Sequence, residues 1–570
     1  MRSTHIHLSV FLLFSLPLYC LSTTYYVSPN GLNGNPGTMT DPLFLIQDAI
    51  HLCSSGKDTI YLMEGTYWQR LSIIDKKGIY LSSIDATNKS TVSGSGVAGA
   101  TQIYIQDSDS ISIANLILRE NVEQEANGIY VVGEGDGIFI SDNEMYNIGW
   151  GTDPSLDPES FTPVRQAHGI LINGRSETGY RNVYIGRNVL HDLIVGNSEA
   201  ITLTGNVFDF LIEDNTLYNI TNIGIDIAGH YAWAFPDSLD QEFNQARDGR
   251  IQRNTIYNCQ RPTNGNEPAG IYVDGGEDVF IDRNISRNNG VGISLGCENA
   301  DESAENIIVV NNLIYNNDKF GMVFGANAGD VEGSTVRNNT FFNNGIFEDN
   351  SGSISLQKST DGVLRNNLIY LLSDDYFGLS MFGFLVNNLV MDHNLFYNTD
   401  GNTPRVFAYN PATGSTDSIE SLNFADPLLV SSDSANPDFH LMQASPAIDA
   451  GSDQLSLIPN ETDIDGTLRV AADIDIGADE WEDPAGIAEL SSWPLTLYPN
   501  PTSAILSATT AIAGLQYLSV YDGSGRCLLS VPAQDLFRIE VNLQDLPAGM
   551  YVIRIDHRTE RAMFRRVLKK

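Results

Sequence analysis

An asparagine-centred phrase that recurs along the middle of the chain constrains the fold more than any other feature of the sequence. The phrase reads hydrophobic-x-x-Asn-x-hydrophobic, as in IEDNTLYN (212–219) and IQRNTIYN (251–258). Its central asparagines are Asn143, Asn188, Asn215, Asn254, Asn284, Asn312, Asn339 and Asn367. From Asn254 onward they follow one another at intervals of 30, 28, 27 and 28 residues. So regular a period indicates a repeat architecture in which each unit stacks on the next.

A second phrase, Gly-Ile-x-hydrophobic-x-Gly, recurs beside the first, for example as GIDIAG (224–229) and GIYVDG (270–275). Both phrases alternate with a period of two, which predicts strands with one buried face. The period is too short for propeller blades and carries no helical pattern. The sequence therefore predicts an all-β solenoid in which equivalent strands pair about 4.8 Å apart and the asparagines stack into an interior ladder.

Over residues 23–400 the chain resembles the right-handed parallel β-helices of the pectin-lyase-like type. The resemblance implies that the amphipathic segment 43–52 forms a helix that caps the open end of the solenoid. Residues 401–484 are expected to form a C-terminal cap, in which 420–482 close the far end. SPAIDAG (445–451) and DIDIGADE (473–480) resemble a terminal module of secreted β-helix proteins. Their aspartates could bind calcium, although solvated turns are the preferred interpretation.

The last residues, 496–570, are different in character and follow an expected linker at 485–495. LYPNPT (497–502), DLPAGMYVIRI (545–555) and FRRVLKK (564–570) together resemble the type A sorting domain of the type IX secretion system. That resemblance implies a small β-sandwich, a Bacteroidetes-type bacterium, the type IX secretion machinery as a partner and export across the outer membrane.

The N-terminus has the pattern of a secretory signal peptide over residues 1–22. Arg2 supplies the positive charge, and residues 8–22 supply an apolar core too short to span a bilayer. No later segment approaches about 18 uninterrupted apolar residues, so no membrane span is expected. The protein is therefore predicted to be secreted or displayed on the cell surface.

The charge balance narrows the range of partners. Aspartate plus glutamate outnumber lysine plus arginine 71 to 32, which gives a net charge of −39. Such a surface repels nucleic acid and anionic lipid, and an acidic polymer would need a bound cation or a basic pocket to bind. After the signal peptide the cysteines, Cys53, Cys259, Cys297 and Cys527, show neither metal-type spacing nor a disulfide framework. A monomer is expected.

Aligning the Gly-Ile strands by their alternation separates inward from outward positions. The first outward column holds Tyr130, Leu171, Thr202, Asp226, Tyr272 and Ser294. The second holds Val132, Asn173, Thr204, Ala228, Asp274 and Gly296. The third holds Glu134, Arg175, Asn206, His230, Gly276 and Glu298. Ionisable groups thus gather on the middle coils of one face, although an ordinary solvated sheet face would also be polar.

Two long insertions adjoin the same strands, at 150–168 and 230–249. Loops of this length in a compact solenoid are usually functional, and these would wall a groove across the face. Tyr231, Trp233 and Phe235 offer flat surfaces on which sugar rings could stack, or they could simply pack the loop.

The resemblance favours a carbohydrate-active enzyme, and two chemistries fit the residues. A glycoside hydrolase needs two carboxylates flanking the bond, a role that Asp274 and Glu298 could fill. A polysaccharide lyase needs a base and a group that neutralises a uronate. Candidate bases are His230, Arg247 and Tyr272, and Asp226, Asp274 and Glu298 could hold calcium.

The leading prediction is a cation-assisted lyase that cleaves a uronate-containing polysaccharide by β-elimination. The alternatives are a hydrolase and a glycan-binding or adhesion protein without chemistry. No specific catalytic motif of a lyase family is present. The expected catalytic residues are Asp274, Glu298, His230 and Arg247. The expected substrate-binding residues are Asp226, Tyr272, Tyr231, Trp233, Asn206 and Arg175.

Overall fold

The computed structural model divides the chain into two compact units, Met1–Trp481 and Glu482–Lys570. In the first unit it describes residues 22–481 apart from 55, 154, 156–164, 262–267, 326–327, 347–350, 374–375, 383–384, 402–403, 411–414, 417–422, 453–460 and 470–473. In the second it describes 495–498, 502, 504–510, 515–521, 527–533, 537–544, 546–557 and 563–570. The predicted signal peptide, apart from residue 22, and the linker up to residue 494 lie outside the described residues.

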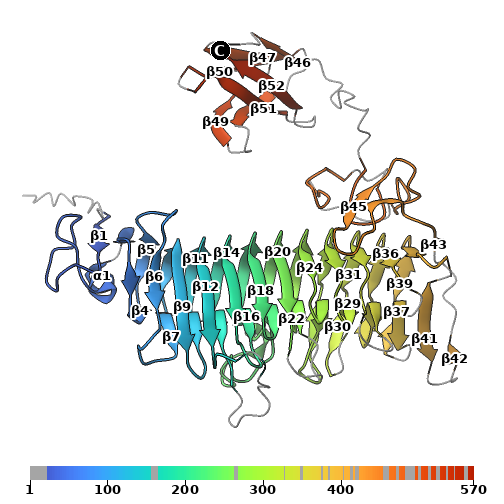
Figure 1. Cartoon of the computed structure of the whole chain (residues 1–570), viewed down its shortest axis with the longest axis horizontal. Helices are drawn as coiled ribbons and strands as arrows, with labels where there is room; N and C mark the ends of the chain where they lie inside the picture. Colours follow the sequence, from blue (N-terminus) through green and yellow to red (C-terminus); the bar gives the residue numbers. More distant parts are fainter. Residues whose placement is uncertain are drawn as a thin grey trace, which may run out of the picture. The chain divides into compact units, whose positions relative to one another are not determined.

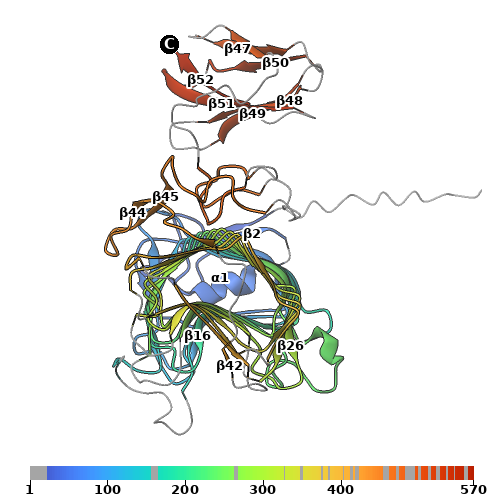
Figure 2. The same ribbon diagram turned by 90° about the vertical axis from the view of Figure 1, so that its right-hand side faces the viewer.

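The first unit is a coil of short strands that forms three long parallel sheets (Figure 1). Seen along the coil axis in Figure 2, the sheets enclose a continuous interior. Sheet 2 carries the Gly-Ile strands. Its strands are β4 (Leu71–Ile74), β7 (Thr101–Gln106), β10 (Asn127–Gly133), β13 (His168–Gly174), β16 (Glu199–Gly205), β19 (Ile223–Ala228), β22 (Ala269–Asp274), β25 (Val291–Gly296), β29 (Phe320–Phe324), β33 (Gly352–Leu356), β37 (Phe377–Phe382), β41 (Arg405–Asn410) and β42 (Ser415–Thr416).

Sheet 1 follows sheet 2 in each middle coil. Its strands are β1 (Thr24–Val27), β2 (Asp58–Leu62), β5 (Lys77–Ser83), β8 (Asp109–Ala114), β11 (Gly135–Ser141), β14 (Tyr180–Gly186), β17 (Val207–Glu213), β20 (Arg247–Gln252), β23 (Glu277–Asp282), β26 (Ser303–Glu305), β27 (Ile308–Val310), β30 (Asp330–Glu332), β31 (Thr335–Arg337), β34 (Ser359–Thr360), β35 (Val363–Arg365), β38 (Val386–Asn387) and β39 (Val390–Asp392).

Sheet 3 completes each coil. Its strands are β3 (Thr66–Tyr67), β6 (Ser90–Ser93), β9 (Leu116–Val122), β12 (Glu144–Gly149), β15 (Val189–Leu193), β18 (Thr216–Ile220), β21 (Thr255–Cys259), β24 (Ile285–Arg287), β28 (Leu313–Tyr315), β32 (Thr340–Phe342), β36 (Leu368–Leu371), β40 (Leu395–Asn398) and β43 (Asn423–Phe424).

The predicted asparagine ladder is confirmed at the corner between sheets 1 and 3. Asn284 is fully buried and donates from Nδ2 to Asn312 Oδ1 over 3.0 Å and to the Ile251 carbonyl over 2.8 Å. In turn, its Oδ1 accepts the backbone N–H of Asn254 over 2.9 Å. The same pattern runs from Asn143 to Asn394, one coil further than the sequence phrase predicted. The ladder therefore satisfies corner backbone groups that the enclosed interior hides from water.

The apolar core fills the interior of the coil. The inward residues of the Gly-Ile strands, such as Ile225, Ile227, Ile271 and Val273, have no exposed surface. A short helix, α1 (Ile46–Leu52), contributes Ile46 and Ile50 to this core at the N-terminal end (Figure 2). Its role as a cap stays a prediction. None of the described helices is long and apolar enough to cross a membrane.

The described residues of 429–481 differ from the expected arrangement, in which 420–482 close the far end. The segment with β44 (Leu429–Ser431) and β45 (Asp438–Leu441) lies along the side of the later coils (Figure 1). Corner asparagines of three successive coils hold it: Asn311 donates to the Thr462 carbonyl, Asn338 to the Asp475 carbonyl, and Asn366 accepts from the Ser452 N–H. Because these corner asparagines recur along the coil, they offer the segment a row of hydrogen-bonding groups on the side of the coil.

The described aspartates of SPAIDAG and DIDIGADE differ: Asp475 and Asp479 are buried acceptors, which contradicts the expectation of solvated turns, whereas Asp449 is exposed in agreement with it. Asp475 is 2% exposed and accepts the backbone N–H groups of Asp449 over 2.7 Å and Trp481 over 2.6 Å. Nearby, Arg337 and Glu461 form a buried ion pair. The segment is consequently fastened to the coil by polar contacts that exclude water.

The second unit is a small antiparallel β-sandwich, as predicted. One sheet holds β46 (Leu495–Tyr498), β47 (Ile505–Thr510) and β50 (Arg538–Asn542). The other holds β49 (Cys527–Pro532), β48 (Leu515–Tyr521), β51 (Gly549–His557) and β52 (Met563–Lys569). Leu506, Val520, Ile539 and Ile553 from both sheets pack into one core of its own.

Candidate active site

The strand pairing of sheet 2 confirms the first two side-chain columns. Thr202 pairs with Asp226, Asp226 with Tyr272, and Tyr272 with Ser294 along three parallel ladders. In the second column Ala228 pairs with Asp274. Because parallel pairing keeps equivalent side chains on the same face, Asp226 and Asp274 lie on neighbouring strands, two positions apart along the chain direction.

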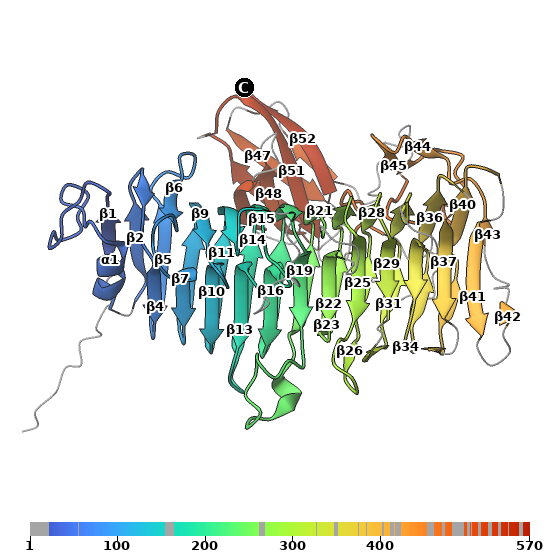
Figure 3. The same cartoon turned by 60° about the horizontal axis from the view of Figure 1, so that its bottom comes forward.

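These outward positions are buried, so an ordinary solvated sheet face is excluded here. Asp226 is 5% exposed and Asp274 is 2% exposed. The insertion after β19 folds back beside them: His230 N–H donates to the Asn244 carbonyl over 2.6 Å, and Gly229 bridges to Gln245. Figure 3 shows this green loop, with its short 3-10 helix η2 (Gln241–Phe243), projecting beyond β16 and β19.

Tyr231 of this insertion links the two predicted catalytic carboxylates. Its hydroxyl lies against Asp274 Oδ2 in a short hydrogen bond and 3.1 Å from Glu298 Oε2. The other carboxylate oxygen of Asp274 accepts the backbone N–H of Glu298 over 2.8 Å. Asp274 thus lies beneath the phenol, whereas Glu298 is exposed. Two oxygens bonded to one hydroxyl are within about 6 Å of each other.

Asp226 is the carboxylate of this group whose burial is least offset by hydrogen bonds. Its Oδ1 is buried and has no hydrogen-bond partner among the described residues. Burial first, and then the negative charges of Glu199, Asp274 and Glu298, raise its pKa well above the ordinary value. An isolated buried carboxylate is costly, so Asp226 favours either a proton or a bound cation.

Glu199 and His168 belong to the site but were missed by the sequence analysis. Glu199 Oε2 accepts a 2.7 Å hydrogen bond from Thr202 Oγ1 and lies 3.6 Å from His168 Nε2. His168 Nδ1 lies 3.2 Å from Asn127 Oδ1. Both residues begin their strands, immediately before the Gly-Ile phrase. Alternation would have placed both side chains inward, because each lies three positions before the outward residue of its strand, so the aligned columns could not have found them.

We call Glu199, Asp226, Asp274 and Glu298 the carboxylate cluster. Burial and the neighbouring charge of Glu298 raise the pKa of Asp274 to about 7, although the bond from Tyr231 opposes this shift. Burial, reinforced by Asp274 and Glu298, raises the pKa of the Tyr231 hydroxyl. Burial also raises the pKa of Tyr272, and the cluster adds to that shift. At neutral pH the cluster therefore contains a carboxylic acid that can donate a proton.

The described side-chain contacts of His230 and Arg247 are made with residues other than the four carboxylates, so a catalytic role for either stays a prediction. His230 has a φ of 66°, and its Nε2 lies 3.1 Å from the Ser303 carbonyl oxygen. Gly275 lies against this ring, since a Cβ there would come within 2.8 Å of His230 Cδ2. Arg247 begins a strand of sheet 1 and stacks 4.9 Å from the centre of the Phe208 ring. Both side chains are held by structural contacts outside the carboxylate cluster.

Two predicted substrate-binding residues also lie elsewhere. Asn206 is fully buried, accepts from Arg247 Nη1 over 2.9 Å and donates to the Ser176 carbonyl over 2.9 Å. These hydrogen bonds engage both the oxygen and the nitrogen of its side-chain amide. Arg175 is exposed beside Tyr130, whose pKa its positive charge lowers against the raising effect of burial. It lies two strands before Asp226 along the same sheet.

The aromatic side chains of the insertion form two kinds of surface. Trp233 is 54% exposed, and its ring centre lies 6.1 Å from that of Tyr231. Phe235, by contrast, is fully buried and packs the loop. Trp233 therefore offers an accessible stacking surface next to Tyr231. Most of the other insertion, residues 154 and 156–164, lies outside the described residues.

The cluster has the donor chemistry of a calcium site, since carboxylate oxygens are the ligands that calcium prefers. The unpartnered Asp226 Oδ1 is the observation that fits such an ion. Yet within the described residues the group with three ligand atoms within 4.8 Å of one another is His440, Asp465 and Asp479. Calcium at Asp226, Asp274 and Glu298 stays a prediction.

The coil and the C-terminal unit each match a family model. Residues 168–347 and 243–413 match the right handed beta helix region, which agrees with the predicted fold class. Residues 496–570 match the secretion system C-terminal sorting domain. The second match confirms the predicted sorting domain, so the chain is exported to the cell surface or the medium.

A curated relative is the uncharacterized protein YwoF of Bacillus subtilis (strain 168). It is 29% identical over 446 residues, which cover 74% of this chain and 91% of YwoF.

Solved structures with a similar coil include three carbohydrate-processing enzymes. An alginate lyase from Paenibacillus sp. str. FPU-7 is 15% identical, covers 59% of this chain and 99% of its own, and has a TM-score of 0.39. The lacto-N-biosidase from Eubacterium ramulus is 13% identical, with coverages of 70% and 68% and a TM-score of 0.40. Pectate lyase Pel9A is 13% identical, with coverages of 81% and 97% and a TM-score of 0.32. Those activities belong to those proteins.

Proposed function

We propose that this protein is an exported enzyme that hydrolyses glycosidic bonds, with Asp274 and Glu298 as its carboxylate pair. The observation that carries the proposal is that one hydroxyl, that of Tyr231, contacts both carboxylates. A glycosidase needs one protonated and one ionised carboxyl group on either side of the scissile bond. A carboxyl group with a pKa of about 7 beside an exposed glutamate meets that requirement.

The spacing favours retention of anomeric configuration. Retaining enzymes hold the two carboxyl groups about 5–5.5 Å apart and inverting enzymes about 6.5–9.5 Å apart. Because the Tyr231 hydroxyl lies 3.1 Å from Glu298 Oε2 and in a short hydrogen bond with Asp274 Oδ2, these two oxygens are at most about 5.6 Å apart, nearer the first range. In this assignment Asp274 protonates the leaving oxygen and Glu298, which is accessible, attacks the sugar. Asp274 reaches the substrate once the Tyr231 ring turns aside.

Charge favours a neutral glycan over a polyuronate. The charges that raise the pKa values of Asp226 and Tyr231 are all carboxylates. A uronate would meet this field without an opposing cation. Trp233, which is 54% exposed, supplies a flat surface on which an uncharged pyranose ring can stack.

The test uses reducing-end release and NMR of the anomeric products on a panel of neutral and uronate-containing polysaccharides. Asp274→Asn and Glu298→Gln should each lower turnover at least about a hundredfold, the size expected for a general acid. Glu332→Gln, an exposed carboxylate of sheet 1, is the matched control and should turn over substrate like the parent. Parent-like turnover in both cluster variants would overturn the assignment. Binding without any turnover would instead favour the glycan-binding alternative.

A second candidate is the cation-assisted lyase. The unpartnered Asp226 Oδ1 favours it, because a divalent ion there would neutralise the cluster and attract a uronate. His230 and Arg247 make their described contacts outside the cluster, so Tyr231 and Tyr272 are the preferred candidates for proton abstraction. A lyase creates an unsaturated sugar that absorbs near 232 nm, and a chelator should abolish that signal. Hydrolysis gives no such absorbance.

A further inference from the structure

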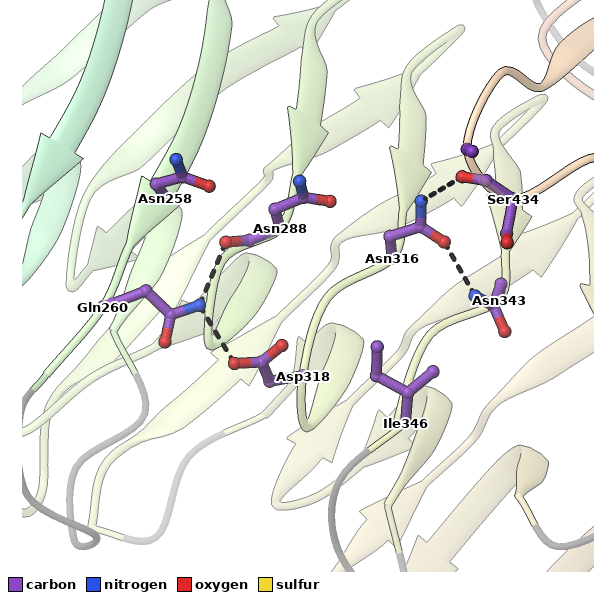
Figure 4. A pocket seen from close by; sticks show the side chains of 9 residues that line it. Asn258, Gln260, Asn288, Asn316, Asp318, Asn343, Ile346 and Ser434 are labelled. Atoms are coloured by element: carbon purple, nitrogen blue, oxygen red, sulfur yellow. Dashed lines mark hydrogen bonds between the residues drawn. The ribbon is translucent and has the colours of Figure 1, made fainter.

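A shallow polar cavity, open to solvent over most of its extent, lies on the outer corner of the coil between sheet 3 and sheet 2 (Figure 4). Its volume is about 460 Å³, within the range of small-molecule pockets. Asn258, Asn288, Asn316 and Asn343 line it from four successive coils. Each follows or ends a strand of sheet 3 with a positive φ of 49–57°, the left-handed turn that asparagine tolerates.

The cavity coincides with a break in a row of side-chain hydrogen bonds. On one side Asn258 Nδ2 donates to Asn219 Oδ1 over 3.2 Å, and on the other Asn343 Nδ2 donates to Asn316 Oδ1 over 2.7 Å. Asn316 Nδ2 turns instead to the Ser434 carbonyl, 2.9 Å away. Within the described part of the chain the side-chain amide of Asn288 has no hydrogen-bond partner. Its donor and acceptor atoms are therefore available to a ligand.

Gln260 and Asp318 are joined by a hydrogen bond in the inner part of the cavity. Gln260 Nε2 donates to Asp318 Oδ2 over 2.9 Å and to the Asn288 carbonyl over 3.0 Å. Burial raises the pKa of Asp318, against the effect of this bond. Ile346 supplies an apolar patch among these polar groups. The lining is thus a set of fixed amides, one carboxyl group and one aliphatic surface.

We propose that this cavity binds an uncharged sugar residue. Amides offer donors and acceptors side by side, which suits adjacent hydroxyl groups, and Ile346 suits the C–H face of a ring. None of the residues lining the cavity carries a positive charge, which disfavours an anion. A single carboxylate is too few for a divalent cation. That the ligand is uncharged follows from the residues that line the cavity. That it is a sugar, and not another polyol, rests on the proposed function.

The cavity lies away from the carboxylate cluster. β22 begins at this corner and ends at Asp274, and the five steps of about 3.3 Å between its first and last residues separate the two by roughly 17 Å. A sugar in the cavity is therefore several residues from a bond at the cluster. The cavity acts as a distal holding site for a long glycan and contributes nothing to the cleavage of a short one.

Binding is measured by calorimetry in the Asp274→Asn background, so that no probe is cleaved. The probes are cellohexaose, xylohexaose and β-1,4-galactohexaose, with hexagalacturonate as the charged comparator. At least one neutral hexaose should bind, and Asn288→Gly should weaken it at least tenfold. Glycine keeps the left-handed turn. The matched control is Asn147→Gly, at the same turn position with a φ of 52° but outside the cavity. It should bind like its parent.

Gln260→Ala provides a second variant should Asn288→Gly fail to fold. Unchanged affinity in the folded cavity variants, binding of hexagalacturonate alone, or no binding of any neutral probe at millimolar concentration would overturn the proposal. Failure of the proposed function is separable. In that case no glycan is turned over by the protein with Asp274 intact, yet Asn288→Gly still weakens hexaose binding. Conversely, turnover without an effect of Asn288→Gly overturns the cavity alone.

Discussion

Replacing Asp274 by asparagine should stabilise the protein at alkaline pH while it removes activity. In the folded protein the pKa of Asp274 is about 7, against an ordinary value of 3.8. Between about pH 4 and pH 7 the folded state therefore holds a proton that the unfolded state has released. Stability falls as pH rises through a window in which the folded state binds more protons. Each unit of pKa difference corresponds to about 1.4 kcal/mol, so the loss is on the order of 4 kcal/mol by pH 8.

Asparagine does not titrate, so Asp274→Asn escapes this loss. Its amide oxygen can still accept the Glu298 N–H, and its NH₂ group can donate to Tyr231, which preserves the local contacts. Compared with the parent, the variant should gain roughly 4 kcal/mol of stability between pH 4 and pH 8. The assay is guanidinium unfolding at both pH values in the presence of a chelator, because a bound cation would lower the pKa. Glu332→Gln, exposed on sheet 1, is the control and should show no such gain. The same stability difference at pH 4 and pH 8 would refute the reasoning.

Three further outcomes follow from the structure. Asn284→Ala should lower the free energy of unfolding by about 1–3 kcal/mol, since it leaves corner groups such as the Asn254 N–H without a partner, while activity per folded molecule stays unchanged. Deletion of residues 490–570 should leave a folded coil by circular dichroism, because the two units have separate cores; an insoluble product would contradict this division. Arg247→Ala should lower the free energy of unfolding by about 1–3 kcal/mol, because the hydrogen bond to Asn206 is lost, and should leave kcat unchanged. A hundredfold loss of kcat at unchanged Tm would instead support Arg247 as a catalytic base.

The regular features of this fold were predictable because they repeat. The period of the asparagines fixed the coil, and alternation along the Gly-Ile strands placed Asp226 and Asp274 on adjacent strands of one face. Parallel pairing keeps equivalent residues on the same face from one coil to the next, as long as these residues lie within strands. Glu199 breaks this rule: it lies three positions before Thr202, with the parity of the inward Ile201, yet its carboxylate accepts from Thr202 Oγ1 on the outer face, so alternation could not have placed it.

Predictions that extended beyond strand ends were less successful. His230 follows β19 in a left-handed conformation that turns its ring toward Ser303, and alternation says nothing about such a residue. Arg247 was treated as part of a loop, yet it starts the next strand of sheet 1. The burial of Asp274 also depends on Tyr231, a contact between an insertion and the sheet that no periodic pattern encodes.

Stability and function are separated between the two faces of the same strands. Inward residues such as Ile271 and Val273 have no exposed surface and belong to a core that runs through the coil. Outward, Asp226 and Asp274 bring negative charges together with raised pKa values, which disfavours the folded state at neutral pH. A chain selected for stability alone would place neutral or paired side chains there. Two neighbouring buried carboxyl groups with raised pKa values therefore argue that the cluster contacts a ligand, because natural proteins tolerate such costs mainly at functional sites.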